Sequence, residues 1–238
     1  MKIRFLGTSF GAPGVGRYQQ SILISQGGGL YIFDAGAPVL DCLIKYGYNP
    51  ADIRAIFISH LHGDHMDGLL DVLNLAEYYG IRCPVYLSER RGIEAFENFA
   101  FLQHCKKCEN VDFRLIKSGE FYRDDNIAVD AVLTAHMAYR ELPSYAFSVK
   151  CGDRSVVITS DLSPTLEDFP KRRADLVITE CAHLSPEAVC EKITSTKTPA
   201  AAIIHVAPTE KYNTLEAMKD TVPFTLLTPE DGEEIEIL

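Results

Sequence analysis

Apolar runs alternate with polar and glycine-rich segments along the whole chain, and this pattern predicts an α/β fold. Most runs are short and rich in isoleucine, valine, leucine and phenylalanine, which is typical of strands buried on both faces. We predict strands at residues 2–6, 21–25, 30–33, 55–58, 84–87, 113–116, 127–133, 145–150, 155–159, 175–179, 201–204, 224–226 and 234–237.

Helices are predicted where apolar residues recur at helical spacing. From Leu69 to Ala76 they fall at i, i+3, i+4 and i+7, which predicts a core-facing helix that ends at Gly80. The stretch Ser185-Pro186-Glu187 is typical of a helix start, because proline suits the first helical position. Further helices are predicted at residues 39–46, 88–105, 163–169 and 214–220.

No linker and no low-complexity segment divides the sequence. Hydrophobic residues make up 47% of the 238 residues, which is enough for a substantial core. We therefore expect residues 1–238 to form one domain in which sheets pack together with helices outside.

Charge and hydropathy narrow the functional classes. The longest apolar runs are too short to span a bilayer, and the N-terminus leads directly into a strand without the features of a signal peptide. These patterns predict a cytoplasmic protein with no membrane partner. The net charge of -10 argues against a broad basic surface for long nucleic acids.

Two further motifs resemble functional sites, but neither predicts a metal site or a nucleotide site. The chain has seven cysteines, and Cys105 and Cys108 form a CxxC that lacks the second pair of a zinc site, so ordinary reduced thiols are predicted. The glycine-rich segment 7–17 resembles a phosphate-binding loop. A strand rather than a helix follows it, so we expect instead a flexible loop near the active site.

Histidine is scarce in the chain and concentrated in one segment. Three of the seven histidines lie in His60-Leu61-His62-Gly63-Asp64-His65, directly after an apolar run. Imidazole and carboxylate groups are common metal ligands at sites with open coordination positions. The segment therefore predicts half of a metal site.

The other half is predicted at the ends of later strands. A single histidine after a strand is usually an ordinary loop residue. Several histidines and acidic residues that follow neighbouring strands meet at one edge of a sheet, and such a cluster indicates a site. The residues that follow or end apolar runs in this way are His136, Asp161, Glu180 and His205.

The spacing of the ligands suits two metals rather than one. In an extended chain His60 and His62 point to the same side, and Gly63 permits a turn that redirects the following residues. We assign His60, His62 and His136 to the first metal, Asp64, His65 and His205 to the second, and Asp161 to both as a bridge. The positive charge of two divalent cations exceeds the negative charge of two carboxylates and a hydroxide. The pocket is therefore expected to attract a small anionic substrate.

In these residues the chain resembles the metallo-β-lactamase superfamily, in the branch of ribonuclease Z and related phosphodiesterases. The segments that carry the resemblance are the histidine-rich motif 60–65, His136, Asp161 in Thr159-Ser160-Asp161, His205, the opening 5–17 and Phe33-Asp34-Ala35-Gly36. The resemblance implies a four-layer αββα sandwich with the metals at one edge, and a homodimer.

The chain departs from ribonuclease Z in two respects. It has no room for the inserted arm with which proteins of that branch grip transfer RNA. It also has Thr179 where their His-Glu-Ala-Thr-like stretch begins with histidine. His183 is a candidate to supply the proton instead, with a plain surface histidine as the alternative, and Glu180 is a candidate to orient a histidine.

These observations predict a dinuclear metal-dependent hydrolase, with phosphodiesterase as the first hypothesis. A metal-bound hydroxide would attack a small anionic phosphodiester, and His183 or Asp64 would deliver a proton to the leaving oxygen. Zinc is the first choice of metal, with manganese and ferrous iron as alternatives. The competing functions are a lactone or thioester hydrolase of the same fold, ribonuclease Z-type transfer RNA processing, and a metal-binding sensor without turnover.

Overall fold

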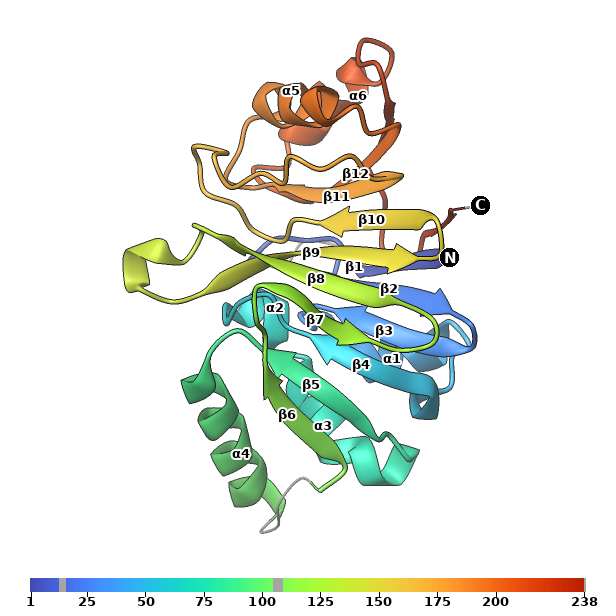
Figure 1. Ribbon diagram of the computed structural model, residues 1–238, viewed down its shortest axis with the longest axis vertical. Coiled ribbons are helices and arrows are strands. Elements are labelled where there is room, and N and C mark those ends of the chain that lie inside the picture. The colour runs from blue at the N-terminus through green and yellow to red at the C-terminus, as the bar shows by residue number, and fades with distance from the viewer. Residues whose placement is uncertain (13–15, 105–108, 238) are drawn as a thin grey trace.

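Two seven-stranded β-sheets lie face to face in the computed structural model, which describes residues 1–12, 16–104 and 109–237 (Figure 1). Helices cover the outer face of each sheet, so the architecture is the expected αββα sandwich. In the first sheet the strands lie in the order β14 (Glu234–Glu236), β1 (Lys2–Gly7), β2 (Ser21–Gln26), β3 (Gly29–Phe33), β4 (Ile53–Phe57), β5 (Cys83–Leu87) and β6 (Val111–Leu115).

The second sheet has the same number of strands and contains the remaining apolar runs. Its order is β13 (Thr225–Leu227), β12 (Ala200–Val206), β11 (Leu176–Cys181), β10 (Arg154–Ile158), β9 (Ser144–Cys151), β8 (Ala128–Thr134) and β7 (Gly119–Arg123). In the first sheet β3, β4 and β5 are parallel, and in the second β10, β11 and β12 are parallel. The carboxyl ends of each parallel set therefore meet at one edge of its sheet.

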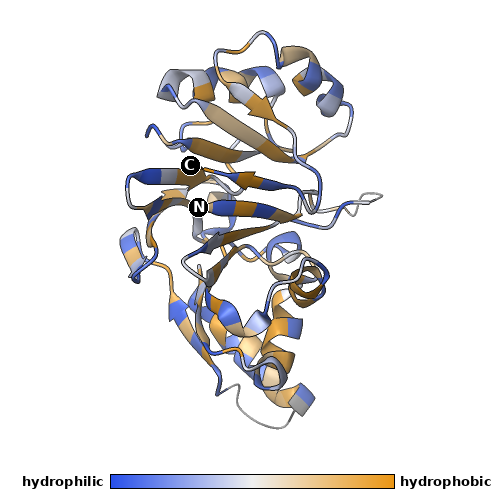
Figure 2. Ribbon diagram, turned by 90° about the vertical axis from the view of Figure 1, so that its right-hand side faces the viewer, coloured by the Kyte–Doolittle hydropathy of each residue, from blue (hydrophilic) through white to orange (hydrophobic). Residues whose placement is uncertain are grey.

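Apolar side chains fill the space between the sheets and the space under the helices. Between the sheets, the Phe33 ring lies 4.9 Å from that of Phe57 and 5.5 Å from that of Phe147, centroid to centroid. Figure 2 shows the strands mainly in the hydrophobic colour and the helices in mixed colours, as expected for helices with one face on a core. Burial on both faces explains why the strands appear in the sequence as continuous apolar runs.

The helices begin and end at residues whose chemistry explains the boundary. α3 (Leu69–Tyr79) ends at Gly80, which adopts the left-handed conformation with φ 69°. α5 (Pro186–Thr196) begins after Ser185, whose hydroxyl accepts a hydrogen bond from the Ala188 N–H. The other helices are α1 (Val39–Lys45), α2 (Gly63–Met66), α4 (Arg90–His104), α6 (Lys211–Met218), and the short 3-10 helices η1 (Pro50–Asp52) and η2 (Ala138–Arg140).

The structure differs from the prediction at a predicted helix that is absent and at a strand that was not predicted. Residues 163–169 were expected to be helical but form turns, because Leu166 has a left-handed backbone (φ 57°) and the Asp168 carboxylate accepts bonds from the Ser163 N–H and hydroxyl. β7 was not predicted, because this edge strand is largely exposed and its sequence has no apolar run.

One prediction falls on residues that the structure does not describe. Cys105 and Cys108, for which ordinary thiols were predicted, lie outside them. Within the described ranges, the helices are all too short or too polar to cross a membrane.

Candidate metal centre

The histidine-rich segment turns sharply at the carboxyl end of β4. His60 and His62 lie in the extended chain before α2, and Asp64 and His65 lie within that short helix. The segment after β3 fixes this turn, because the Ala35 N–H donates to the His65 carbonyl and the Gly68 N–H donates to the Ala35 carbonyl. The turn after Gly63 that the sequence predicted is therefore held by a neighbouring strand end.

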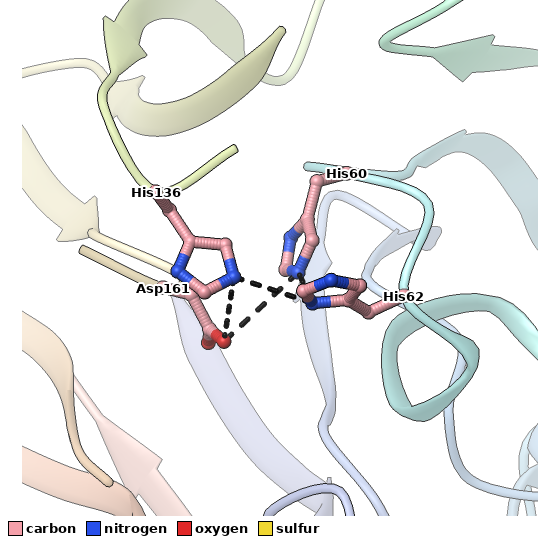
Figure 3. A group of neighbouring side chains, drawn as sticks. All are labelled: His60, His62, His136 and Asp161. Atoms are coloured by element: carbon pink, nitrogen blue, oxygen red, sulfur yellow. Dashed lines mark hydrogen bonds and ion pairs between the residues drawn. The ribbon is translucent and has the colours of Figure 1, made fainter. Parts of the chain in front are cut away.

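Three histidines and one aspartate form the first ligand group. His60 Nε2 and His62 Nδ1 lie 3.0 Å apart, and His136 Nε2 lies 3.2 Å from the same His62 nitrogen. Asp161 Oδ2 lies 3.5 Å from His136 Nε2 and 3.9 Å from His60 Nε2. All four side chains point to a common centre, His60 and His62 from the segment after β4 and His136 and Asp161 from the segments after β8 and β10, as Figure 3 shows. Such spacing of one donor atom per residue fits a single cation.

A second group lies on the other side of Asp161. Asp64 Oδ2 lies 3.6 Å from His65 Nε2 and 3.7 Å from His205 Nε2. Asp161 Oδ1 lies 3.3 Å from His65 Nε2, and its Oδ2 lies 3.7 Å from His205 Nε2. Asp161 thus lies between the two groups and contacts residues of both, and its role as a bridge between two metals stays a prediction.

Buried atoms without partners support a cation at this centre. His65 Nε2 and Asp161 Oδ1 are buried and have no hydrogen-bond partner among the described residues. A buried polar atom without a partner is costly, and both atoms point into the ligand groups. The donor set of imidazole nitrogens and carboxylate oxygens, arranged as two groups that share Asp161, therefore fits two divalent metal ions.

The electrostatics of the first group favour neutral imidazoles. Burial lowers the pKa of His60 well below its ordinary value and also lowers the pKa values of His62 and His136. Neutral imidazole is the form that binds metals. Burial also opposes the charged forms of His65 and Asp161. The carboxylates of Asp161 and Asp34 nevertheless raise the pKa of His65, and His205 and His65 lower the pKa of Asp161.

Asp34 holds the second group in place, a role that the strand-end argument did not assign to it. Its Oδ2 lies 2.8 Å from His65 Nδ1 and accepts hydrogen bonds from the hydroxyls of Ser59 and Ser160, at 3.0 Å each. A carboxylate behind a ligand histidine fixes the ring so that its other nitrogen faces the metal. Asp34 also follows an apolar strand, β3, and that position is the signal that could have revealed it.

Glu180 and His183 form a separate pair beside the first group. His183 Nδ1 lies 3.0 Å from Glu180 Oε1, and this hydrogen bond raises the pKa of His183. The Leu162 N–H donates to Glu180 Oε1, and the N–H groups of Ala182 and His183 donate to Oε2. Although Asp161, Glu180 and His183 lie close enough to hold a metal, both Glu180 oxygens are already occupied. The hydrogen bond to Glu180 therefore fixes the His183 ring, and Nε2 of His183 is left for other contacts.

Gly36, in the segment after β3, lies against the backbone of Asp64. A Cβ atom there would lie 1.8 Å from the Asp64 carbonyl oxygen, so Gly36→Ala must displace the turn that carries Asp64 and His65. We expect metal affinity to fall about tenfold, the lower end of the loss from disturbing an outer-shell contact, as measured by calorimetric titration. Gly11→Ala is the control, because its Cβ would lie 3.5 Å from Asp64 Oδ2, at ordinary contact distance. Equal affinity in both variants would contradict the expectation.

The position of Gly11 also places the glycine-rich loop. A Cβ on Gly11 would lie 3.5 Å from Asp64 Oδ2, so the loop lies beside the second ligand group at this residue, as the sequence predicted, and its flexibility stays a prediction. Gln19 supports the loop by donating to the Gly11 carbonyl. The loop therefore forms part of the wall around the centre.

Comparison with known proteins identifies the family of the chain. A family model described as Anti-Pycsar protein Apyc1 matches residues 1–198. Ribonuclease Z of Shouchella clausii (strain KSM-K16) is 30% identical over 158 residues, which cover 65% of this chain and 49% of the relative. The chain therefore spans about half the length of this curated relative.

Solved structures share the fold over almost the whole chain. The metallo-beta-lactamase fold protein YhfI from Bacillus subtilis has a TM-score of 0.80 and 20% identity, and covers 99% of both chains. A diphosphatase from the PhnP family has a TM-score of 0.75 and 17% identity, and covers 100% of this chain and 98% of its own. These likenesses confirm the metallo-β-lactamase fold that the sequence motifs predicted.

Proposed function

The chain belongs to the family described as Anti-Pycsar protein Apyc1, and from this premise we propose that it is a metal-dependent phosphodiesterase for small anionic substrates. The observation that carries the proposal is the position of Asp161 between two ligand groups. Paired divalent cations in such a site activate water and stabilise the charge that develops on both sides of a displacement at phosphorus. Zinc is the metal that we propose first.

The protein's own residues orient the reacting groups. Three neutral histidines and Asp161 define one side of the centre, and Asp64, His65 and His205 define the other. Asp34 fixes the His65 ring from behind, at 2.8 Å. With two divalent cations held by these residues, the centre would carry a net positive charge that attracts an anionic phosphodiester, in a protein whose net charge is -10.

His183 is the group that we propose as proton donor to the leaving oxygen. Its Nδ1 is bound to Glu180, so its Nε2 is the nitrogen left to meet a substrate. Its ring centroid lies 4.8 Å from that of His136, which places it at the border of the first ligand group. Asp64 acting through water is the alternative donor, but it already lies among the ligands of the second group.

Small substrates are favoured over transfer RNA by the charge of the chain. The relative from Shouchella clausii is a ribonuclease Z, and the PhnP-family neighbour is a diphosphatase. A net charge of -10 disfavours binding to a long polyanion, since such binding depends on many lysine and arginine contacts. We therefore propose the small phosphodiester as substrate and keep transfer RNA processing as an outcome of the test.

A substrate panel tests the proposal. Protein purified without chelators is assayed for metal content and for hydrolysis of bis-p-nitrophenyl phosphate, a cyclic nucleotide, a lactone, a thioester and a transfer RNA precursor. We expect about two divalent ions per chain, as for two-metal sites, and turnover of the phosphodiesters. Preference for the lactone or thioester, cleavage of the precursor, or a metal-loaded protein inert towards all five would each overturn the proposal.

A further inference from the structure

Lys211, at the start of α6, reaches across to the loop that carries His183. Its ammonium group donates three hydrogen bonds to backbone carbonyls, at 2.8 Å to Cys181, 3.1 Å to Ala182 and 2.7 Å to Leu184. The side chain is partly buried, and its three donors are all accounted for by these carbonyls. The three carbonyls thus lie around one ammonium group, and the Leu184 carbonyl also accepts a hydrogen bond from the Cys181 thiol at 3.4 Å.

The same loop is tied to Glu180 from its other side. The N–H groups of Ala182 and His183 both donate to Glu180 Oε2, at 2.7 Å and 2.9 Å. The carbonyls of Cys181, Ala182 and Leu184 thus accept from Lys211, and the N–H groups of Ala182 and His183 donate to Glu180. His183 lies in the middle of this loop, so its ring position depends on both contacts.

We propose that Lys211 is a positioning residue that holds the 181–184 loop so that His183 can deliver its proton to the leaving group. The proposal rests on the proposed phosphodiesterase function. Lys211 itself makes no contact with the ligand groups in the interactions described above. It acts through backbone carbonyls, and its role is to fix the place of a neighbouring catalytic candidate.

α6 also connects this loop to the glycine-rich loop. Tyr212, next to Lys211, lies under the Arg17 guanidinium, whose carbon is 4.9 Å from the ring centroid. Arg17 in turn donates to the Thr8 hydroxyl and to the Pro229 carbonyl. The first turn of α6 therefore supports two loops beside the metal centre, of which only the 181–184 loop carries a candidate proton donor.

The test uses Lys211→Ala in the metal-loaded protein, with Lys219→Ala as the matched control. Lys219 lies at the end of the same helix and pairs only with Glu216 among the interactions described. The first readout is backbone amide hydrogen exchange at residues 182 and 183, which does not depend on activity. We expect faster exchange in Lys211→Ala and unchanged exchange in Lys219→Ala.

The second readout is turnover of two phosphodiesters that differ in their leaving group. An alkoxide leaving group needs a proton, whereas p-nitrophenolate leaves without one. In Lys211→Ala we expect kcat for the alkyl ester to fall about 10- to 100-fold, with KM and metal content unchanged, and kcat for the p-nitrophenyl ester to change by less than about twofold.

Chemical rescue separates positioning from a general loss of structure. Propylamine supplies the missing methylenes and ammonium, so it should slow the exchange and restore alkyl-ester turnover in Lys211→Ala. Unchanged exchange, equal loss on both esters, or no rescue would overturn the role of Lys211. If the wild-type protein hydrolyses no phosphodiester, the proposed function fails, and hydrogen exchange with and without propylamine still decides whether Lys211 holds the loop.

Discussion

Replacing Asp161 with asparagine is expected to remove most of the bound metal and to lower phosphodiester turnover by more than about 100-fold, the upper end of what an outer-shell change costs. Asp161 is buried, and its oxygens face His65 on one side and His136 on the other, at 3.3 Å and 3.5 Å. Asparagine keeps the shape but offers only one oxygen and no charge, so it can no longer serve both ligand groups.

Metal content and activity are measured on the same preparations, by elemental analysis and by hydrolysis of bis-p-nitrophenyl phosphate. Asp153→Asn is the matched control, because Asp153 is exposed in the turn between β9 and β10 and belongs to none of the ligand groups. His62→Ala is a second test of the first group and should lose metal as well. An Asp161→Asn protein that retains two metal ions and full activity would refute the shared-ligand assignment.

Replacing His183 with alanine is expected to have a large effect that depends on the leaving group. General acid catalysis contributes about 10²- to 10⁴-fold, so turnover of an alkyl phosphodiester should fall within that range. Turnover of a p-nitrophenyl ester should change little, because its leaving group needs no proton. Metal content should be unaffected, since Nδ1 of His183 is bound to Glu180 and the ring belongs to neither of the two main ligand groups.

Glu180→Gln provides the companion to this variant. Glutamine keeps one acceptor oxygen for the Ala182 and His183 N–H groups, but its NH2 group replaces the oxygen that accepts from the Leu162 N–H and lies beside His183 Nδ1. We expect it to resemble His183→Ala in its selectivity between the two esters, with a smaller loss. If both variants lose activity equally on the two esters, His183 takes no part in proton transfer and Asp64 becomes the candidate donor.

Local chemistry in the sequence was enough to predict most of the metal centre. The ligand types, their position after apolar runs, and the turn permitted by Gly63 predicted the grouping of His60 with His62 and of Asp64 with His65. The structure brings these residues together with Asp161 between them. Such prediction succeeds because parallel strands place their carboxyl ends at one edge whatever the details of packing.

The sequence was less informative where an element depends on side chains that return to the backbone. Residues 163–169 have a helical pattern, yet the Asp168 carboxylate bonds the Ser163 and Ala135 N–H groups and holds the segment in turns. An edge strand such as β7 likewise has no core on its outer side to require an apolar run. In residues 163–169, side-chain hydrogen bonds to the backbone overrode the local helical preference. In β7, the sequence had no apolar run from which a strand could be predicted.

By itself, the sequence determined the fold class and predicted the set of metal ligands and the type of chemistry that they would support. Only the tertiary structure decided how those ligands are held: Asp34 reaches Ser160 across 126 positions, and Lys211 reaches Cys181 across 30. The physical reason is that a ligand must be of a particular residue type, which a sequence displays directly. A supporting contact needs only a donor and an acceptor at the right distance, and folding alone brings those together.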